Sequence, residues 1–110
     1  MLKRSQLVIV QTTFESEQEA QTMAQGLVSQ KLAACVHLNA VESFYEWNDS
    51  FCQTKEYTLQ IKTIADFYDE VKAFILENHS YDTPEILLFK IEKSSLDYAQ
   101  WVEETLSLKP

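Results

Sequence analysis

Glycine is almost absent from this chain, because Gly26 is the only glycine among 110 residues. A phosphate-binding loop of the glycine-rich kind needs several glycines, since its backbone must approach the phosphate closely. The sequence therefore excludes such a loop. Turns must instead be built from Asn, Asp, Ser and Pro, and suitable stretches occur at Asn48–Ser50 and Asp82–Pro84.

Arginine is equally scarce, with Arg4 as the only one, and the formal net charge is −8. Nucleic acids and anionic membranes are bound by clusters of Lys and Arg. We therefore expect neither nucleic acid nor a membrane as a partner. No Ser or Cys lies at a spacing from His and Asp that would indicate a catalytic nucleophile, so the sequence predicts no catalytic residue.

Cysteine and long apolar runs are also rare. No apolar run reaches the 18 or so residues of a membrane span, and residues 1–6 lack the apolar region of a secretion signal. The two cysteines, Cys35 and Cys52, fall at opposite ends of one predicted hairpin, too far apart for a disulfide. Reduced thiols are typical of the cytosol, so we expect a cytoplasmic protein.

The stretch Cys35–Lys62 is the most distinctive feature that is present. Two aromatic and β-branched runs flank the polar residues Asn48–Ser50, which predicts a hairpin with a three-residue turn. Each arm has about 12 residues and spans roughly 40 Å, whereas a compact domain of this length is roughly 34 Å across. The hairpin must therefore curl or leave the body. A change in alternation near Asn39–Val41 predicts a bulge.

Aromatic side chains on a protruding hairpin promote aggregation unless something covers them. The aromatic residues of the two arms are Phe44, Tyr45, Trp47, Phe51 and Tyr57. The simplest cover is another copy of the same chain, so the sequence predicts a homo-oligomer.

Strands and helices alternate along the chain. The patterns predict a strand at 7–10, a helix at about 16–30, the hairpin, a helix that begins near 63 and ends around 79–81, a strand from Pro84 to Phe89, and a terminal helix capped by Ser94 and Asp97. This is the order of the ferredoxin-like unit, with one helix added. We therefore expect a single α+β domain over residues 1–110, a ferredoxin-like βαββαβ sandwich. Gly26 either marks a close contact of its helix or has no special role.

The first and last strands pose a packing problem. Residues 7–10 and 86–89 are apolar on both faces, yet a ferredoxin-like sheet carries helices on one face only. The terminal helix is too short to cover the second face alone. A partner subunit is therefore needed for a reason that is independent of the hairpin.

Five segments of the chain resemble the CutA family of divalent-cation tolerance proteins. They are Lys31–Val36, Ser43–Trp47, Ile61–Thr63, His79–Ile86 and Tyr98–Trp101, in that order. The resemblance covers about residues 7–106 and implies a ferredoxin-like fold and a homotrimer, in which long hairpins interlock and the sheets face inward. It links bacterial members to tolerance of copper and other divalent metals and animal members to acetylcholinesterase anchoring. It implies no agreed reaction.

The resemblance also implies a place to look for copper. The site proposed in some members uses a Cys just after the first strand and two adjacent His residues, and the matching positions here are Gln11, Asn78 and His79. Only His79 matches, and one imidazole does not hold copper tightly. His79 is nevertheless the metal-ligand candidate of this sequence. The alternative is that it caps the preceding helix.

Two further groups of residues are candidates for binding. Cys35 and His37 lie two apart on one strand, so both point to the same face and could supply two ligands of a Cu or Zn site, with a third from another element or subunit. The alternative is a buried thiol beside a partly exposed His. The resemblance retains Lys62, Tyr81 and Glu85. If these three converge, they could line a ligand pocket between subunits, although a structural ion pair is an equal alternative. Trp47 and Trp101 are expected to be packing anchors.

The sequence and the resemblance together predict a cytoplasmic homotrimer that binds Cu²⁺ or another divalent cation and is not an enzyme. The alternative is a trimer that senses small molecules at its inter-subunit clefts, comparable with PII signalling proteins. A third possibility is an enzyme that uses Glu85 and Lys62 as acid and base.

Overall fold

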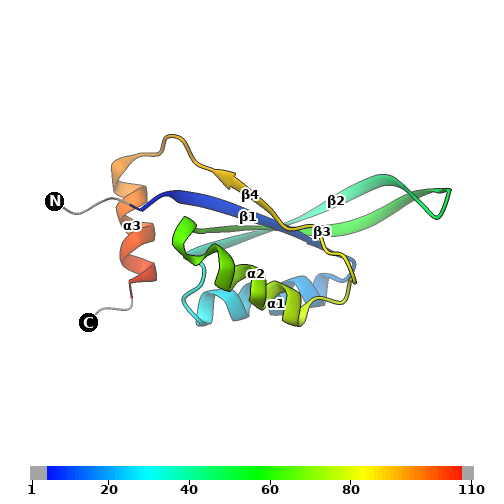
Figure 1. The fold of residues 1–110 in the computed structure, drawn as a ribbon, viewed down its shortest axis with the longest axis horizontal. Helices are drawn as coiled ribbons and strands as arrows, with labels where there is room; N and C mark the ends of the chain where they lie inside the picture. The colour runs from blue at the N-terminus through cyan, green and yellow to red at the C-terminus, as the bar shows by residue number, and fades with distance from the viewer. Residues whose placement is uncertain (1–4, 108–110) are drawn as a thin grey trace.

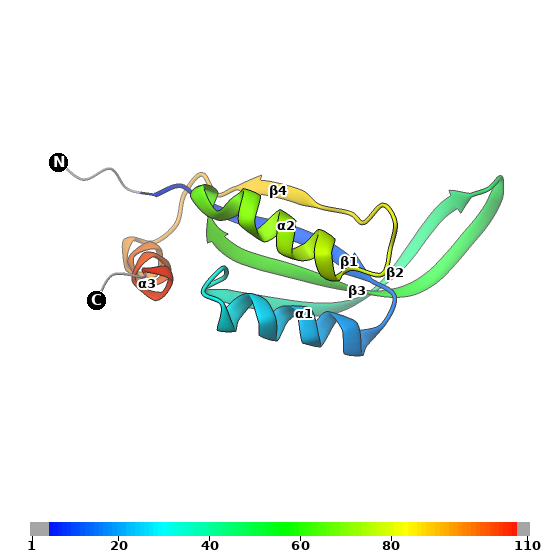
Figure 2. The same cartoon turned by 60° about the horizontal axis from the view of Figure 1, so that its bottom comes forward.

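A computed structural model describes residues 5–107 and contains four strands and three α-helices. They are β1 (Leu7–Phe14), α1 (Glu17–Ser29), β2 (Cys35–Trp47), β3 (Ser50–Ile64), α2 (Tyr68–Asn78), β4 (Leu87–Lys90) and α3 (Leu96–Leu106). The sheet has the order β2-β3-β1-β4, and each neighbouring pair is antiparallel. Helices α1 and α2 lie side by side along the sheet (Figures 1 and 2). The predicted ferredoxin-like order, with an added C-terminal helix, is confirmed.

The long hairpin is also confirmed. Its pairing runs without interruption from Cys35 opposite Lys62 to Trp47 opposite Ser50, and its tip extends far beyond the helices (Figure 1). The molecule is accordingly 54 Å long but only 26 and 21 Å in the other directions. The hairpin therefore leaves the body rather than curling back.

Two details of the predicted hairpin are wrong. The turn has two residues rather than three, and both Asn48 and Asp49 have positive φ angles, 52° and 62°. That combination matches the twist of the strands, and Asn and Asp tolerate it better than most residues. The predicted bulge near Asn39–Val41 is absent, because the register is continuous there. Toward the tip from these residues, α1, α2 and α3 cover neither face of the hairpin (Figure 1). Alternation of apolar and polar residues there therefore does not indicate which side chains are buried.

The core lies between the sheet and the helix pair. Alternate residues of β1 and β3 face the helices and are fully buried, as are the inner residues of α1 and α2. These side chains are Val8, Val10, Phe14, Ala20, Leu27, Leu59, Ile61, Val71 and Ile75. Ser16 caps α1, since the Glu19 N–H donates to Ser16 Oγ. Gly26 does mark a close contact, because a Cβ there would lie 2.8 Å from the Phe74 ring.

The sheet face opposite α1 and α2 is called here the open face. Helix α3 covers only one end of it, where Val102 and Leu106 pack with Leu7 and Ile64. In the rest of this face β4 leaves two large apolar residues uncovered, Leu87 at 45% and Phe89 at 47% exposure. As predicted, a single chain therefore leaves part of the apolar open face uncovered.

The boundaries of four predicted elements are wrong. Strand β1 continues to Phe14 instead of ending at Val10. Thr63 and Ile64 belong to β3 rather than to a helix, because they pair with Val8 and Leu7. Strand β4 begins at Leu87 rather than at Pro84. Helix α3 is capped by Ser95 instead of Ser94, since Ser95 Oγ accepts the Tyr98 N–H. Within residues 5–107 no helix is both long and apolar enough to cross a membrane.

Candidate functional site

His79 lies directly after α2, and other groups already engage its ring on every side. The ring stacks on Phe14, with centroids 4.1 Å apart and planes 11° from parallel. Its Nε2 is 2.9 Å from the Thr13 carbonyl oxygen, and its Nδ1 accepts the Tyr81 N–H at 3.1 Å. A carbonyl oxygen can only accept, so Nε2 carries the hydrogen and Nδ1 the lone pair. Both nitrogens are therefore occupied within the chain.

The positions that the resemblance associates with copper do not fit a metal in one chain. Gln11 donates its amide to Glu85, and Asn78 donates its amide to the Phe74 carbonyl oxygen. Asn78 rather than His79 thus satisfies a carbonyl at the end of α2. Across residues 5–107 no three His, Cys, Asp or Glu side chains form a group that could hold a metal ion.

Tyr81 and Ser80 fasten the segment after His79 to the body. The Tyr81 hydroxyl donates to Glu56 Oε2 at 2.6 Å, and Ser80 donates its N–H and its hydroxyl to the Glu19 carboxylate. Burial and, secondly, the hydrogen bond to Glu56 raise the pKa of Tyr81 above its ordinary value. The phenol is therefore a proton donor over the physiological range rather than a base.

The predicted convergence of Lys62, Tyr81 and Glu85 does not occur within one chain. Lys62 extends toward α3, with its Nζ 5.7 Å from the centre of the Tyr98 ring. Tyr81 is bonded to Glu56, and Glu85 accepts from Gln11. The three residues thus contact different neighbours, and Glu85 and Lys62 form no acid–base pair in one subunit.

Cys35 and His37 behave as their spacing predicts. They lie opposite Lys62 and Gln60 on the open face of β2. Neither side chain has a hydrogen-bond partner among residues 5–107, and both cysteines are free. Cys52 pairs with Tyr45 near the hairpin tip, so the prediction of unbridged cysteines is confirmed.

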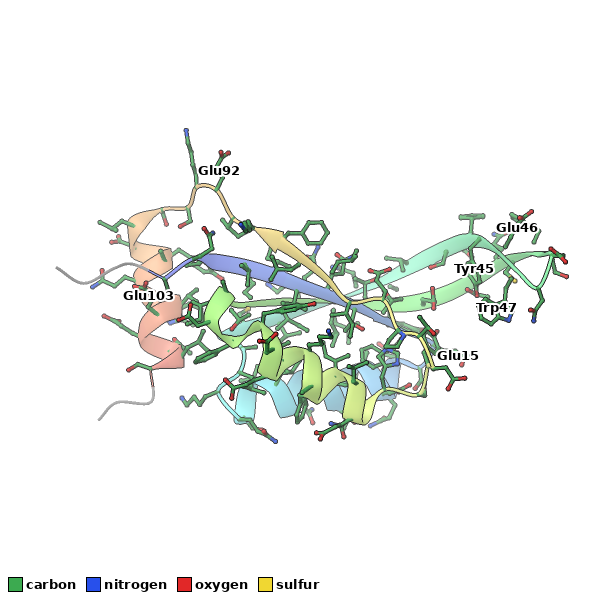
Figure 3. The ribbon with its side chains drawn as sticks, in the orientation of Figure 1. Glu15, Tyr45, Glu46, Trp47, Glu92 and Glu103 are labelled. Atoms are coloured by element: carbon green, nitrogen blue, oxygen red, sulfur yellow. The ribbon has the colours of Figure 1, made fainter. Side chains whose placement is uncertain are left out.

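The two tryptophans keep large exposed areas in a single chain, although the Trp101 ring centre lies 5.6 Å from that of Tyr98. Trp47 is 66% and Trp101 44% exposed. Figure 3 shows Tyr45 and Trp47 near the tip of the hairpin, away from the helices. Their predicted role as packing anchors therefore requires a second molecule.

Sequence analysis missed two residues that shape this region. Glu56 holds Tyr81, and Glu19 holds Ser80. Neither Glu19 nor Glu56 lies in a sequence motif that indicates a role in this region. Hydrogen bonds between residues 25 and 61 positions apart leave no local signal in a sequence.

Replacing Tyr81 with Phe should change how stability depends on pH. The folded state holds the Tyr81 proton more tightly than the unfolded state. The contribution of Tyr81 to the free energy of unfolding is therefore fully present below about pH 10 and is lost as pH rises above it. At pH 8 we expect Tyr81→Phe to lower the free energy of unfolding by about 1.5–3 kcal/mol, the contribution of a hydrogen bond to a charged group.

Above pH 10 the difference between the two proteins should shrink, and urea unfolding at pH 8, 10 and 11 measures it. Glu56→Gln, which keeps the shape but removes the carboxylate, serves as the second variant. Its stability difference from the natural protein should shrink less above pH 10, because Tyr81 stays buried and burial is the larger cause of its raised pKa. A difference that stays constant from pH 8 to 11 would contradict this role of Tyr81.

Known proteins match the chain over most of its length. The family model for the CutA1 divalent ion tolerance protein matches residues 8–105. A divalent-cation tolerance protein CutA from Pyrococcus horikoshii is 34% identical over 100 residues, which cover 90% of this chain and 98% of the relative.

Solved structures agree in fold. CutA from Synechococcus elongatus is 31% identical, with a TM-score of 0.91 over 96% of this chain and 95% of that one. The periplasmic divalent cation tolerance protein CutA from Archaeoglobus fulgidus is 31% identical, with a TM-score of 0.88 over 92% and 99%. With a match that runs from β1 to α3, the chain belongs to the CutA1 divalent ion tolerance protein family.

Proposed function

We propose that the protein is a non-enzymatic homotrimer that binds Cu²⁺ or another divalent cation and acts in divalent-cation tolerance. Membership of the family supports the role in tolerance. The uncovered open face supports the assembly, and it is the observation that carries this proposal. The acid–base candidates Glu85 and Lys62 contact different neighbours within the chain, which supports the absence of catalysis.

One chain leaves apolar surface bare both on the open face and at the hairpin tip. Leu87 and Phe89 lie on the open face, and the hairpin tip carries Phe44, Trp47 and Phe51, each more than 60% exposed. Exposed apolar surface of this extent is typical of protein–protein interfaces. Trimer formation would bury it and give the hairpin a surface to lie on.

A metal site in this assembly would need ligands from more than one subunit, because one chain offers too few. Cys35 and His37 are the best pair, since they share the open face and have no other bond among the described residues. The Lys62 ammonium lies opposite Cys35 and repels a cation. We therefore expect modest affinity and place the metal nearer to His37 than to His79.

Calorimetric titration with Cu²⁺ and with Zn²⁺ tests this proposal. We expect saturable heat in the natural protein, its loss in His37→Ala and its retention in His79→Gln. If only His79→Gln lost binding, His79 would be the ligand. The metal would then have to displace the Tyr81 N–H from His79 Nδ1. Absence of saturable heat in the natural protein would refute metal binding altogether.

A second candidate function is sensing of a small molecule at clefts between subunits, as in PII signalling proteins. The Lys62 ammonium supports it, because among residues 5–107 it has neither an ion-pair partner nor a hydrogen bond. Thermal-shift screening with nucleotides and metabolites tests it. A stabilising compound whose effect is lost in Lys62→Met or Tyr81→Phe supports this function, and a screen without any such compound counts against it.

We also propose a cytoplasmic location. Both cysteines are unpaired, which suits a reducing compartment. The relative from Archaeoglobus fulgidus is described as periplasmic, so fractionation of cells with an antibody to the chain is the direct test.

A further inference from the structure

A small apolar cavity lies where α3 meets the open face. Its volume is about 190 Å³, and it is partly open to solvent and lined by strand residues, by the connection from β4 to α3, and by α3 itself. The side chains that matter here are Leu7, Ile9, Lys62, Ile91, Tyr98 and Val102. An apolar cavity of about 150 Å³ is enough to bind benzene, so this one has room for a small organic molecule.

The backbone and hydroxyl groups around the cavity already have hydrogen-bond partners within the chain. The Ile91 N–H donates to the Leu7 carbonyl oxygen, and the Ile91 carbonyl oxygen accepts from Gln6. Ser94 donates its hydroxyl to the Ser95 carbonyl oxygen. Polar groups around the apolar walls are thus already paired within the chain.

Lys62 is the exception. Its ammonium has no carboxylate or hydrogen-bond partner among residues 5–107, and its only recorded neighbour is the Tyr98 ring, 5.7 Å away. Two carboxylates of α3 and the connection before it do not pair with the Lys62 ammonium. Glu103, on α3, accepts the Ser5 N–H, and Glu92 points outward from the connection between β4 and α3 (Figure 3). A cation with three donors therefore borders an apolar cavity without an anion to bind.

We propose that this cavity binds a small monocarboxylate with an apolar body of about six or seven carbon atoms. The apolar part lies against Ile9 and Val102, and the carboxylate accepts hydrogen bonds from the Lys62 ammonium beside Tyr98. Lys62 is only partly buried and Tyr98 is 37% exposed, so the charged end of the ligand stays near solvent and the entrance is at these two residues.

This site differs from the metal role in position and in charge. It lies within one subunit, and it selects an anion, although the protein as a whole is acidic. The net charge of −8 repels anions at long range, but that repulsion is screened at 0.15 M salt beyond about 8 Å. The site needs no metal, so chelator can be present when it is tested, but it rests on the proposed trimer leaving the α3 end of the open face accessible.

The test uses benzoate as the probe, with benzamide as its uncharged analogue, in buffer with chelator and 0.15 M salt. Methyl NMR spectra follow the titration. Benzoate should shift the Val102 and Val8 methyl signals saturably, while those of Val28, on the outer side of α1, stay still. Benzamide should bind about tenfold more weakly or worse, the loss expected for one charge-assisted hydrogen bond.

Three variants complete the design. Lys62→Met should weaken benzoate binding about tenfold, while Lys55→Met should leave it unchanged. Lys55 is a matched control, since its Nζ lies 6.0 Å from the Tyr57 ring, far from the cavity. Ile9→Phe should block binding by filling the cavity with Lys62 intact, which separates loss of space from loss of charge.

Several results would overturn the proposal. Equal binding of benzoate and benzamide, or unchanged binding in Lys62→Met, would show that the ammonium plays no part. No saturable shift in the natural protein would show that the cavity takes no carboxylate. If Lys62→Met lowered the oligomer mass and benzoate had no effect, a carboxylate of another subunit would be the partner of Lys62.

Discussion

Replacing Leu87 and Phe89 together with aspartate should convert the assembly into monomers. Both side chains are nearly half exposed in one chain and lie two residues apart on the open face. In the proposed trimer they are covered, and two buried charges without partners would cost several kcal/mol per subunit. Sedimentation velocity should show three copies of 12.8 kDa, about 38 kDa, for the natural protein and 12.8 kDa for the variant.

The matched control is a second pair of aspartates at apolar residues that are equally exposed. Val28 on α1 and Leu76 on α2 are 44% and 50% exposed and belong to the helix layer, away from the open face. Val28→Asp with Leu76→Asp should leave the sedimentation coefficient unchanged. The central assembly proposal fails if the natural protein sediments as a folded monomer at micromolar concentration.

Replacing Phe14 with Ala should give the largest loss of stability from a single side chain. Phe14 is fully buried in the main core and also supports the His79 ring. Removing a buried phenyl ring typically lowers the free energy of unfolding by about 3–5 kcal/mol. We expect a loss in this range, because the helix–sheet interface and the His79 hydrogen bonds are disturbed together.

Urea unfolding at one fixed protein concentration measures this loss, since the stability of an oligomer depends on concentration. Phe14→Leu is the matched variant, because it keeps most of the apolar volume. It should lose less than half as much as Phe14→Ala. A loss below about 1 kcal/mol for Phe14→Ala would mean that the core closes around the missing ring.

The arrangement of elements was predictable because burial repeats along the sequence. The buried residues of α1 recur at helical spacing, and those of β1 and β3 recur at every second position. The prediction failed where burial comes from distant segments. Thr63 and Ile64 were assigned to a helix, but pairing with β1 and cover from α3 hold them in β3. Around Asn39–Val41 the side chains are at most partly buried and the pairing is continuous, so the change in alternation there did not indicate a bulge.

The candidate site was less predictable than the fold. The sequence marks His79, Lys62, Tyr81 and Glu85 as unusual, but it does not say what each one touches. The structure shows that His79 uses both nitrogens internally and that the other three have separate neighbours. Such contacts depend on how β1, β3 and α3 meet, which no spacing within one segment encodes.

The unbroken register of the hairpin limits how its length can change in evolution. Adding one residue to a single arm would shift the pairing and turn every side chain beyond that point to the other face. One residue added to each arm would restore the pairing but still exchange the faces of Tyr45 and Trp47 with those of Phe44 and Phe51. Relatives with longer or shorter hairpins that assemble in the same way should therefore differ by two residues per arm, four in total.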